Sequence, residues 1–306
     1  MAMHNADVII AIGARFDDRI TNTPSLFSPK ARIIHIDVDP ASISKIINAD
    51  IPIVGQVKES IAALIKEIKR SKLKIDSDAL DEWNSQISTW RAKHGLDHEL
   101  YLKKNKSKMI LPQVVVQELY HATNGNAWVT SDVGQHQMFV AQYYHFNKPR
   151  RWVNSGGLGT MGFGLPAAMG VKLAFPKDEV VCVTGEGSIQ MCIQELSTCL
   201  QYNLPIKIIN INNEALGMVR QWQDMNYGGR HSASTYSDSL PDFVKLTQSY
   251  GHVGLKVTKK SQLKKTLEKA FAMKDRLVFV DVYVDPNEHV YPMLVAPNGS
   301  MKDMWI

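Results

Sequence analysis

Short apolar runs alternate along this chain with stretches in which apolar residues recur every three or four positions. Residues 57–70, for example, place Val57, Ile61, Leu64 and Ile68 on one face of a helix. Apolar runs that predict strands cover 7–13, 32–39, 51–54, 127–133, 179–184, 206–211 and 277–284. Because strands that alternate with helices form parallel sheets with crossover connections, we predict an α/β fold with a doubly wound parallel sheet.

The same pattern predicts the remaining helices and the domain boundaries. Helices are expected over 41–48, 79–93, 114–121, 135–143, 166–175, from 188 to about 202, and over 263–273. The stretch 71–108 is polar and charged, with four lysines between 103 and 108, which is typical of a solvated connector. We therefore predict one α/β part over 1–70, a linker over 71–108 and a complete domain over 109–306.

Composition excludes several classes of protein. The apolar fraction of 44% and the net charge of +5 are ordinary for a globular protein, and the basic excess is spread along the chain. We expect no nucleic-acid partner, because no basic arm or zinc spacing is present. We expect no membrane span and no signal peptide. The three cysteines form no disulfide framework, which favours a reducing, cytoplasmic location.

Candidate chemistry gathers where the strand 179–184 ends in Gly185-Glu186-Gly187-Ser188. Glycines allow a sharp turn and a close approach of the backbone, and the helix that follows offers free N–H groups to an anion. Glu186 would repel a phosphate at this corner unless a cation lay between them. Magnesium suits that place, because it binds protein oxygens, phosphate and water together.

A second oxygen ligand is expected from the end of the next strand, where Asn213 stands. Parallel strands of one sheet present their carboxyl ends at the same edge, so Glu186 and Asn213 should lie close together. By itself the Gly-Glu-Gly turn is also compatible with an ordinary strand-to-helix connection. The pair of positions favours a site for magnesium and a diphosphate.

The segment from Gly185 to Asn213 resembles the thiamine diphosphate motif, which begins Gly-Asp-Gly and ends Asn-Asn. The resemblance is closest to the catalytic subunits of the acetolactate (acetohydroxyacid) synthases. The stretches that carry it are SDVGQHQMFVAQ (131–142), NSGGLGTMGFGLPAA (154–168), GEGSIQMCIQEL (185–196), LGMVRQWQDM (216–225), LPDFVKL (240–246), GARFDDR (13–19) and HIDVD (35–39). One departure is Glu186, which replaces the usual aspartate with a longer carboxylate.

The resemblance implies particular roles for these residues. Mg²⁺ would be held by Glu186 and Asn213 with the carbonyl of Ala215. Contacts to thiamine diphosphate are implied for Gln135, His136, Gly159, Thr160, Met161, Gly187, Ser188 and Leu216. His136 could instead be a capping histidine.

Two further residues are implied near the reaction. Met218 would lie beneath the cofactor, and Trp222 would face the substrate pocket. Plain core packing remains an alternative for each, because methionine and tryptophan at helical spacing often fill a core.

The first seventy residues resemble the carboxyl-terminal part of the family's central, FAD-binding domain. FAD contacts are implied for Gly13, Ala14, Arg15, Phe16, Asp17, Asp37 and Val38, and Arg19 would lie near the substrate channel. This first part has no GxGxxG pattern, and Gln56 replaces an acid that the family often carries.

The function that this resemblance implies is acetolactate synthesis. Such an enzyme decarboxylates pyruvate and joins the two-carbon unit to pyruvate or 2-ketobutyrate, in the biosynthesis of valine, leucine and isoleucine. A homodimer and a small regulatory subunit are the implied partners. The family's pyrimidine-binding domain has no counterpart here, so we expect a carboxyl-terminal half with little turnover and no FAD of its own. The alternatives are another thiamine diphosphate carboligase or oxidase, and a silent fragment that acts in assembly.

Overall fold

The computed structural model describes residues 1–94, 101–102, 104–236, 238–294 and 299–303. The chain forms two compact units, which are residues 1–105 together with 291–306, and residues 106–290. This division differs from the predicted boundaries, because the last sixteen residues belong to the first unit and not to the second. The predicted linker contains a helix, α4 (Ser77–His94), that belongs to the first unit.

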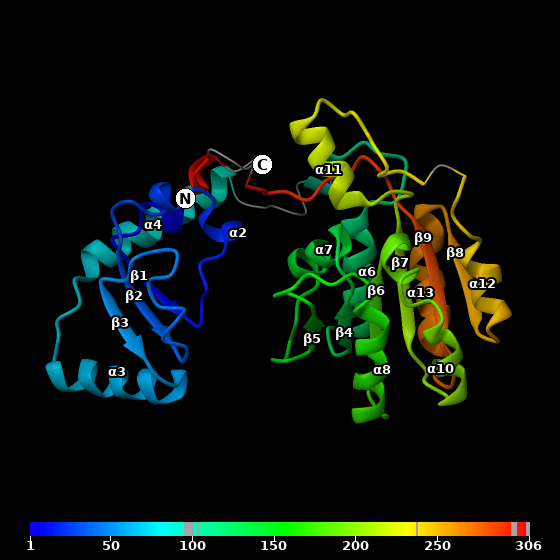
Figure 1. The fold of residues 1–306 in the computed structure, drawn as a ribbon, viewed down its shortest axis with the longest axis horizontal. Helices are drawn as coiled ribbons and strands as arrows, with labels where there is room; N and C mark the ends of the chain where they lie inside the picture. Colours follow the sequence, from blue (N-terminus) through cyan, green and yellow to red (C-terminus); the bar gives the residue numbers. More distant parts are fainter. Residues whose placement is uncertain (95–100, 103, 237, 295–298, 304–306) are drawn as a thin grey trace. The chain divides into compact units, whose positions relative to one another are not determined.

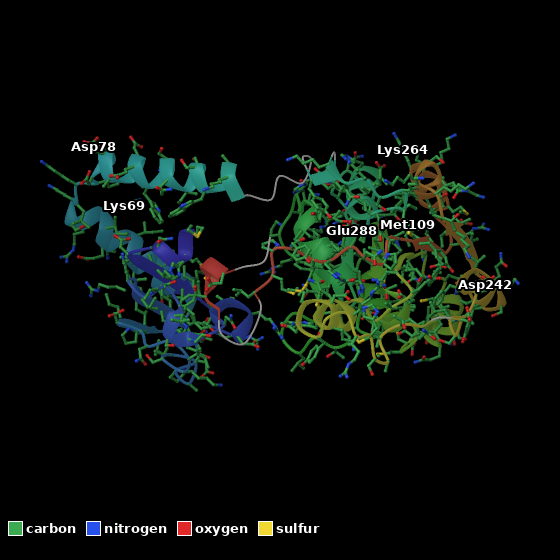
Figure 2. All side chains as sticks on the ribbon, turned by 90° about the horizontal axis from the view of Figure 1, so that it is seen from above. Lys69, Asp78, Met109, Asp242, Lys264 and Glu288 are labelled. Atoms are coloured by element: carbon green, nitrogen blue, oxygen red, sulfur yellow. The ribbon has the colours of Figure 1, made fainter. Side chains whose placement is uncertain are left out.

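The first unit is built on a small parallel sheet in the order β1-β2-β3. Its strands are β1 (Val8–Ile12), β2 (Arg32–Asp37) and β3 (Ile51–Val54). The helix α3 (Val57–Ser71) follows β3 and precedes α4; Figure 2 labels Lys69 on the former and Asp78 on the latter. Short helical turns complete the unit: α1 (Ala2–Asn5), α2 (Asp18–Thr21), η1 (Pro24–Leu26) and η2 (Met301–Asp303).

The helix predicted over 41–48 is wrong, because this segment consists of turns. Asp39 accepts a hydrogen bond from the backbone N–H of Ala41, and Ser44 accepts one from that of Ala49. Ser44 also adopts a φ of 57°. Short polar side chains that bind nearby N–H groups compete with helix formation, and here they do so successfully.

The second unit contains a six-stranded sheet in the order β5-β4-β6-β7-β9-β8, and every pair in it is parallel. Its strands are β4 (Trp128–Ser131), β5 (Trp152–Asn154), β6 (Val180–Thr184), β7 (Lys207–Asn212), β8 (Val253–Val257) and β9 (Val278–Tyr283). The predicted α/β fold with a doubly wound parallel sheet is confirmed. The two edge strands, β5 and β8, are additional to the prediction.

Helices cover both faces of this sheet (Figure 1), so that every residue of β6 and β7 is buried. The helices of this unit are α6 (Pro112–Thr123), α7 (Gln135–Tyr143), α8 (Gly164–Ala174), α9 (Glu186–Ile189), α10 (Glu195–Gln201), α11 (Gly217–Asn226), α12 (Phe243–Ser249) and α13 (Lys260–Ala272). The helix predicted from 188 to 202 is two helices, and the Gln190 side chain donates to the Glu186 carbonyl where the first one ends. No helix in the described part of the chain has the length and apolarity that a membrane span requires.

The strand order reverses between β4 and β6, because the chain continues from β4 to β5 on one side and to β6 on the other. Such a switch point leaves a crevice at the carboxyl ends of the two strands, where α/β proteins bind ligands. The loops that follow β4, β6 and β7, with the first turns of α7, α9 and α11, carry most of the residues of this unit that were singled out in the sequence.

Candidate active site

A cavity lies at the carboxyl ends of β4, β6 and β7, within the second unit. It is lined by Pro112, Val133, Gly134, Gln135, His136, Phe139, Met161, Gly185, Glu186, Gly187, Ser188, Ile211, Asn213, Ala215, Leu216, Gly217, Met218 and Val219. Apolar side chains and a few converging polar groups are the usual lining of a small-molecule site.

Two side-chain oxygens of the cavity lining converge on one backbone N–H group. The backbone N–H of Ala215 donates to Glu186 Oε1 at 2.7 Å and also lies 3.3 Å from Asn213 Oδ1. Both side-chain oxygens are therefore held against a single N–H group. A carboxylate oxygen and an amide oxygen that lie side by side form a donor pair of the kind that Mg²⁺ takes from proteins.

The carboxyl of Glu186 is only 1% exposed, and burial raises its pKa to about 8. Hydrogen bonds from nearby backbone N–H groups oppose this rise, whereas the negative charge of Asp281 adds to it. A buried carboxylate without a counter-charge is costly, and a bound cation would favour its ionised form. The burial of Glu186 is thus consistent with a place for a cation.

A second buried acid supports the turn that carries Asn213. Asp281 on β9 accepts hydrogen bonds from Asn210 and Asn212, at 2.8 and 3.1 Å, and burial raises its pKa. Asn212 in turn accepts from the N–H of Glu214, which has the unusual φ of 56°. These bonds fix a turn that a non-glycine residue adopts only at a cost.

The loop after β4 contributes a buried imidazole to the same cavity. Burial lowers the pKa of His136 to about 3, so the ring is neutral near pH 7. Its Nε2 is buried and has no hydrogen-bond partner among the described residues. A buried polar atom that lines a cavity and lacks a partner points to a ligand group in that cavity.

Two glycines at the start of α9 allow neighbouring side chains to pack closely against the backbone. A Cβ at Gly187 would lie 2.5 Å from Tyr236 Oη, and one at Gly185 would lie 2.8 Å from His136 Nδ1. Ser188 donates to the carbonyl of Val133 and so joins this corner to the loop after β4. A larger residue at position 187 would therefore collide with the side chains of Tyr236 and Leu216.

The glycine-rich stretch before α8 is held by the buried Asp132. Asp132 Oδ1 accepts from the N–H groups of Val133 and Gly162, at 3.0 and 2.8 Å, and Oδ2 accepts from Thr184 at 3.2 Å. Burial raises the pKa of Asp132, and these hydrogen bonds oppose the rise. Asp132 therefore fixes the segment that presents Met161 to the cavity.

The residues present fit a diphosphate that is bound through Mg²⁺. The donor pair of Glu186 and Asn213, the partnerless Nε2 of His136 and the backbone of Gly187 all line one cavity. Among the residues that the structure describes, no group of three or more His, Cys, Asp or Glu could hold a metal ion. Mg²⁺ with one or two protein ligands normally completes its shell with phosphate oxygens and water.

Most of the predicted residues of the second unit come together here. The cavity lining includes Gln135, His136, Met161, Glu186, Gly187, Ser188, Asn213, Ala215, Leu216 and Met218. Gly159, Thr160 and Trp222 were also predicted but are not part of that lining. Gln135 presents its side chain to Asn213 and Gln221, at 3.0 and 2.8 Å.

The predicted flavin contacts lie in the first unit, at the adjacent carboxyl ends of β1 and β2. Gly13 has a φ of 60° and donates to the carbonyl of Ile36, while Arg15 pairs with Asp17 at 3.0 Å. Phe16 is only 4% exposed and packs against Phe27 and His35, so its side chain is part of the core. Arg15, Arg19 and Val38 are exposed here, whereas Ala14 and Asp37 are half-buried, and Asp37 accepts from the N–H of Asp39.

The sequence patterns did not single out four residues whose side chains hydrogen-bond to the segments that line the cavity. They are Asp132, Asn212, Gln221 and Asp281, all of which are buried. Asp132 could have been noticed as an acid at the end of a predicted strand. Gln221 gives no comparable signal, because a glutamine within a helix is usually exposed.

Two family models match the chain. Residues 132–282 match the C-terminal TPP binding domain of thiamine pyrophosphate enzymes, and residues 1–64 match the central domain of the same enzymes. The first match covers the whole cavity except Pro112.

Whole-chain comparison finds acetolactate synthase large subunits. The chain is 54% identical over 308 residues to acetolactate synthase isozyme 3 large subunit of Escherichia coli K12, covering 100% of this chain and 52% of that protein. It is 53% identical over 303 residues to the large subunit of Haemophilus influenzae, covering 99% and 52%, and 41% identical over 302 residues to that of Corynebacterium glutamicum, covering 98% and 47%. The chain spans about half the length of these relatives, and the predicted resemblance is confirmed.

Proposed function

Because the chain belongs to the thiamine pyrophosphate enzyme family, we propose that its second unit holds thiamine diphosphate through Mg²⁺. Glu186 and Asn213 would supply the two protein ligands, with the Ala215 carbonyl as a third. His136, Gly187 and Ser188 would meet the diphosphate. The observation that carries this proposal is the convergence of Glu186 and Asn213 on the N–H of Ala215, in the cavity that the partnerless Nε2 of His136 also lines.

Each group of the chain has a defined task at this site. When bound, thiamine diphosphate supplies the carbanion chemistry that protein side chains lack. Glu186 and Asn213 orient the diphosphate end through the cation, and Asp132 holds the glycine-rich loop from which Met161 faces the cavity. Met218 on α11 lines the same cavity and limits the conformation that a ligand can adopt there.

For the whole protein we propose the activity of its relatives, acetolactate synthesis. Pyruvate would be decarboxylated, and the remaining two-carbon unit would be joined to pyruvate or 2-ketobutyrate. Trp222, near Met218 on α11, would face these substrates, and Arg19 would lie near their channel. The identity of 54% to the E. coli large subunit over the full chain favours this activity over that of another carboligase or oxidase.

The binding proposal is tested by calorimetric titration of thiamine diphosphate into the chain with and without Mg²⁺. We expect Mg²⁺-dependent binding that Glu186→Ala weakens by at least about 100-fold, because loss of even an outer-shell group costs 10- to 100-fold at metal sites. Glu268→Ala, an exposed change on α13, serves as the matched control. Undiminished binding by the Glu186→Ala protein would contradict the metal ligand.

Catalysis is tested separately by acetolactate formation from pyruvate, Mg²⁺ and thiamine diphosphate. The chain would be assayed alone and together with the amino-terminal half of its E. coli relative. Acetolactate in either arm supports the proposed activity, and 2-ketobutyrate added as a competing acceptor measures substrate preference. A lack of product in both arms, with cofactor bound, would favour a non-catalytic role.

For the first unit we propose contacts to FAD in the whole protein, from Gly13–Asp17, Asp37 and Val38. The adjacent ends of β1 and β2 support this, because Gly13 turns sharply there and Asp37 lies beside it. Flavin absorbance that co-purifies with the protein, and that Gly13→Val reduces, is the test. Assembly into a homodimer, and with a small regulatory subunit, would be tested by analytical ultracentrifugation.

A further inference from the structure

A chain of side-chain amides runs from Asn213 through the interior of the second unit. Asn213 Nδ2 donates to Gln135 Oε1 at 3.0 Å, and Gln135 Nε2 donates to Gln221 Oε1 at 2.8 Å. Gln221 then meets the backbone of Val290, donating from Nε2 to the carbonyl and accepting at Oε1 from the N–H, both at 2.9 Å. We call these four residues the amide relay.

The backbone of Val290 gives the relay its direction. A backbone N–H can only donate and a carbonyl can only accept, so Gln221 must point its oxygen to the former and its NH₂ to the latter. Gln221 Oε1 then requires a donor from Gln135, which leaves the oxygen of Gln135 to accept from Asn213. The backbone of Val290 thus orients Gln221, Gln221 orients Gln135, and Gln135 orients Asn213.

The last amide in the relay is the one that matters for the cation. With its NH₂ engaged by Gln135, Asn213 can turn only its oxygen toward Ala215 and Glu186. An amide that rotated by half a turn would fill the same volume but present NH₂ to a cation. Because the two ends of an amide have nearly the same shape, packing alone cannot select between them.

Burial of the two glutamines and hydrogen bonds from the segment before Val290 hold the far end of the relay in place. Gln221 is fully buried and Gln135 is 6% exposed. Glu288, labelled in Figure 2, lies just before Val290; its carboxylate accepts from Gln113 at 2.9 Å, and its backbone carbonyl lies 3.4 Å from Gln135 Nε2. Asp285 donates its N–H to Ile110 at 2.8 Å. The segment that ends at Val290 is therefore tied to the start of α6.

Space for the relay depends on Gly217. A Cβ at this position would overlap Gln135 Oε1 and would lie 2.6 Å from Asn213 Nδ2. The first residue of α11 therefore lies directly against the hydrogen bond between Gln135 and Asn213.

We infer that Gln221 and Gln135 are positioning residues that direct the oxygen of Asn213 toward the cation of the diphosphate site. The inference rests on the proposed binding of thiamine diphosphate through Mg²⁺. Neither glutamine needs to touch the cation, and Gln221 acts through Gln135 and Asn213.

The first test compares Gln221→Leu with Gln223→Leu, the same substitution two residues along α11. Gln223 bonds to Ser232 and Ser234 and takes no part in the relay. We expect Gln221→Leu to raise the dissociation constant of Mg²⁺ about tenfold or more, measured by calorimetry at saturating thiamine diphosphate, because outer-shell partners have effects of that size. Gln223→Leu should leave it unchanged. Equal affinity of the wild-type and Gln221→Leu proteins would overturn the inference.

A second test separates orientation from a general loss of structure. The Asn213→Asp side chain offers an oxygen whichever way it is turned. The relay is then not needed to direct an oxygen toward the cation. In that background Gln135 Oε1 would face a carboxylate, and breaking the relay would free Gln135 to turn its NH₂ toward it. We therefore expect Gln221→Leu to be neutral or favourable for Mg²⁺ affinity when residue 213 is aspartate. An equal loss in both backgrounds would show a merely structural role and overturn the inference.

These titrations distinguish a failure of the proposed function from a failure of the relay. If the wild-type chain binds no thiamine diphosphate with Mg²⁺, the proposed function fails. If the wild type binds and the double-mutant cycle shows no coupling between positions 213 and 221, only the relay fails.

Discussion

At the scale of single residues, Glu186 departs strongly from its behaviour in water. Burial raises the pKa of its carboxyl to about 8, and the backbone N–H of Ala215 is its closest partner. The folded protein thus keeps this proton at pH values where the unfolded chain has released it. A raised pKa in the folded state means that the contribution of Glu186 to stability is complete below about pH 4.5 and is lost as the pH rises toward 8.

Glu186→Gln should remove this dependence in protein freed of divalent cations. Gln keeps an oxygen for the N–H of Ala215 but does not titrate. We expect the variant to gain stability relative to the wild type between pH 5 and 8, by on the order of a few kcal/mol, since one pKa unit corresponds to about 1.4 kcal/mol. Urea denaturation in EDTA at a series of pH values measures this difference. Glu268→Gln, exposed on α13, should show a flat difference, and a flat difference for Glu186→Gln would contradict the burial argument.

The sequence could predict Glu186 and Asn213 because each is a polar residue directly after a buried strand. Ends of parallel strands meet, so chain position alone indicated proximity. Gln221 could not be found in this way, since its burial depends on the return of the segment 285–290, far along the chain. Whether Trp222 meets a substrate stays a prediction, because it does not line the described cavity.

Among the elements, the junction between β4 and the glycine-rich loop depends on one buried carboxylate. Asp132→Ala leaves the N–H groups of Gly162 and Val133 without their acceptor, and we expect a loss of about 2–4 kcal/mol. Asp132→Asn should cost much less, because its oxygen can still accept from Gly162 while its NH₂ faces the hydroxyl of Thr184. Urea denaturation measures both, with the exposed Asp275→Ala as control. Equal losses for the alanine and asparagine variants would argue against this hydrogen-bonding role.

At the amino end of β7, opposite the end that faces the cavity, a lysine side chain is buried. Lys207 begins β7 and donates to the carbonyls of Met273 and Arg276, at 2.8 and 3.1 Å, in the turn after α13. Burial lowers its pKa to about 8. The folded state therefore loses this proton before the unfolded chain does, and stability should rise with pH from about 8 to 10.5. Lys207→Met should lack that rise in urea denaturation, while the exposed Lys269→Met should keep it. A rise of the same size in Lys207→Met would assign it to other groups.

Strand prediction succeeded where burial makes a strand uniformly apolar. β6 and β9 are flanked by strands on both sides and read as largely apolar runs, with Asp281 as the one charged residue. The edge strands β5 and β8 are only partly buried, so Trp152–Asn154 and Val253–Val257 lack such a run. The turns over 41–48 were misread as a helix because local hydrogen bonds from Asp39 and Ser44 outweigh the spacing of apolar residues.

At the scale of the whole molecule, the residues of the proposed thiamine diphosphate site all belong to one unit. The cavity and the amide relay draw only on residues 112–290, within the unit 106–290. The predicted flavin contacts draw only on the first unit. A ligand that binds the folded form of one unit stabilises that unit against opening, by a free energy that grows with the logarithm of the ligand concentration over the dissociation constant.

Hydrogen exchange measured by mass spectrometry should therefore respond to Mg²⁺ and thiamine diphosphate in a defined region. At a ligand concentration about 100 times the dissociation constant, global opening of the second unit should cost about 2.7 kcal/mol more than without ligand. Peptides that cover 132–136, 185–188 and 211–217 should gain the most protection, because they contain the cavity lining. Peptides from β1 and β2 should change little, since no proposed contact to this ligand lies there. In Glu186→Ala the added protection should disappear from all three peptides together, because they meet at one cation. Protection that appeared at β1 and β2 instead would place the diphosphate on the first unit and contradict the assignment of Glu186 and Asn213 as its metal ligands.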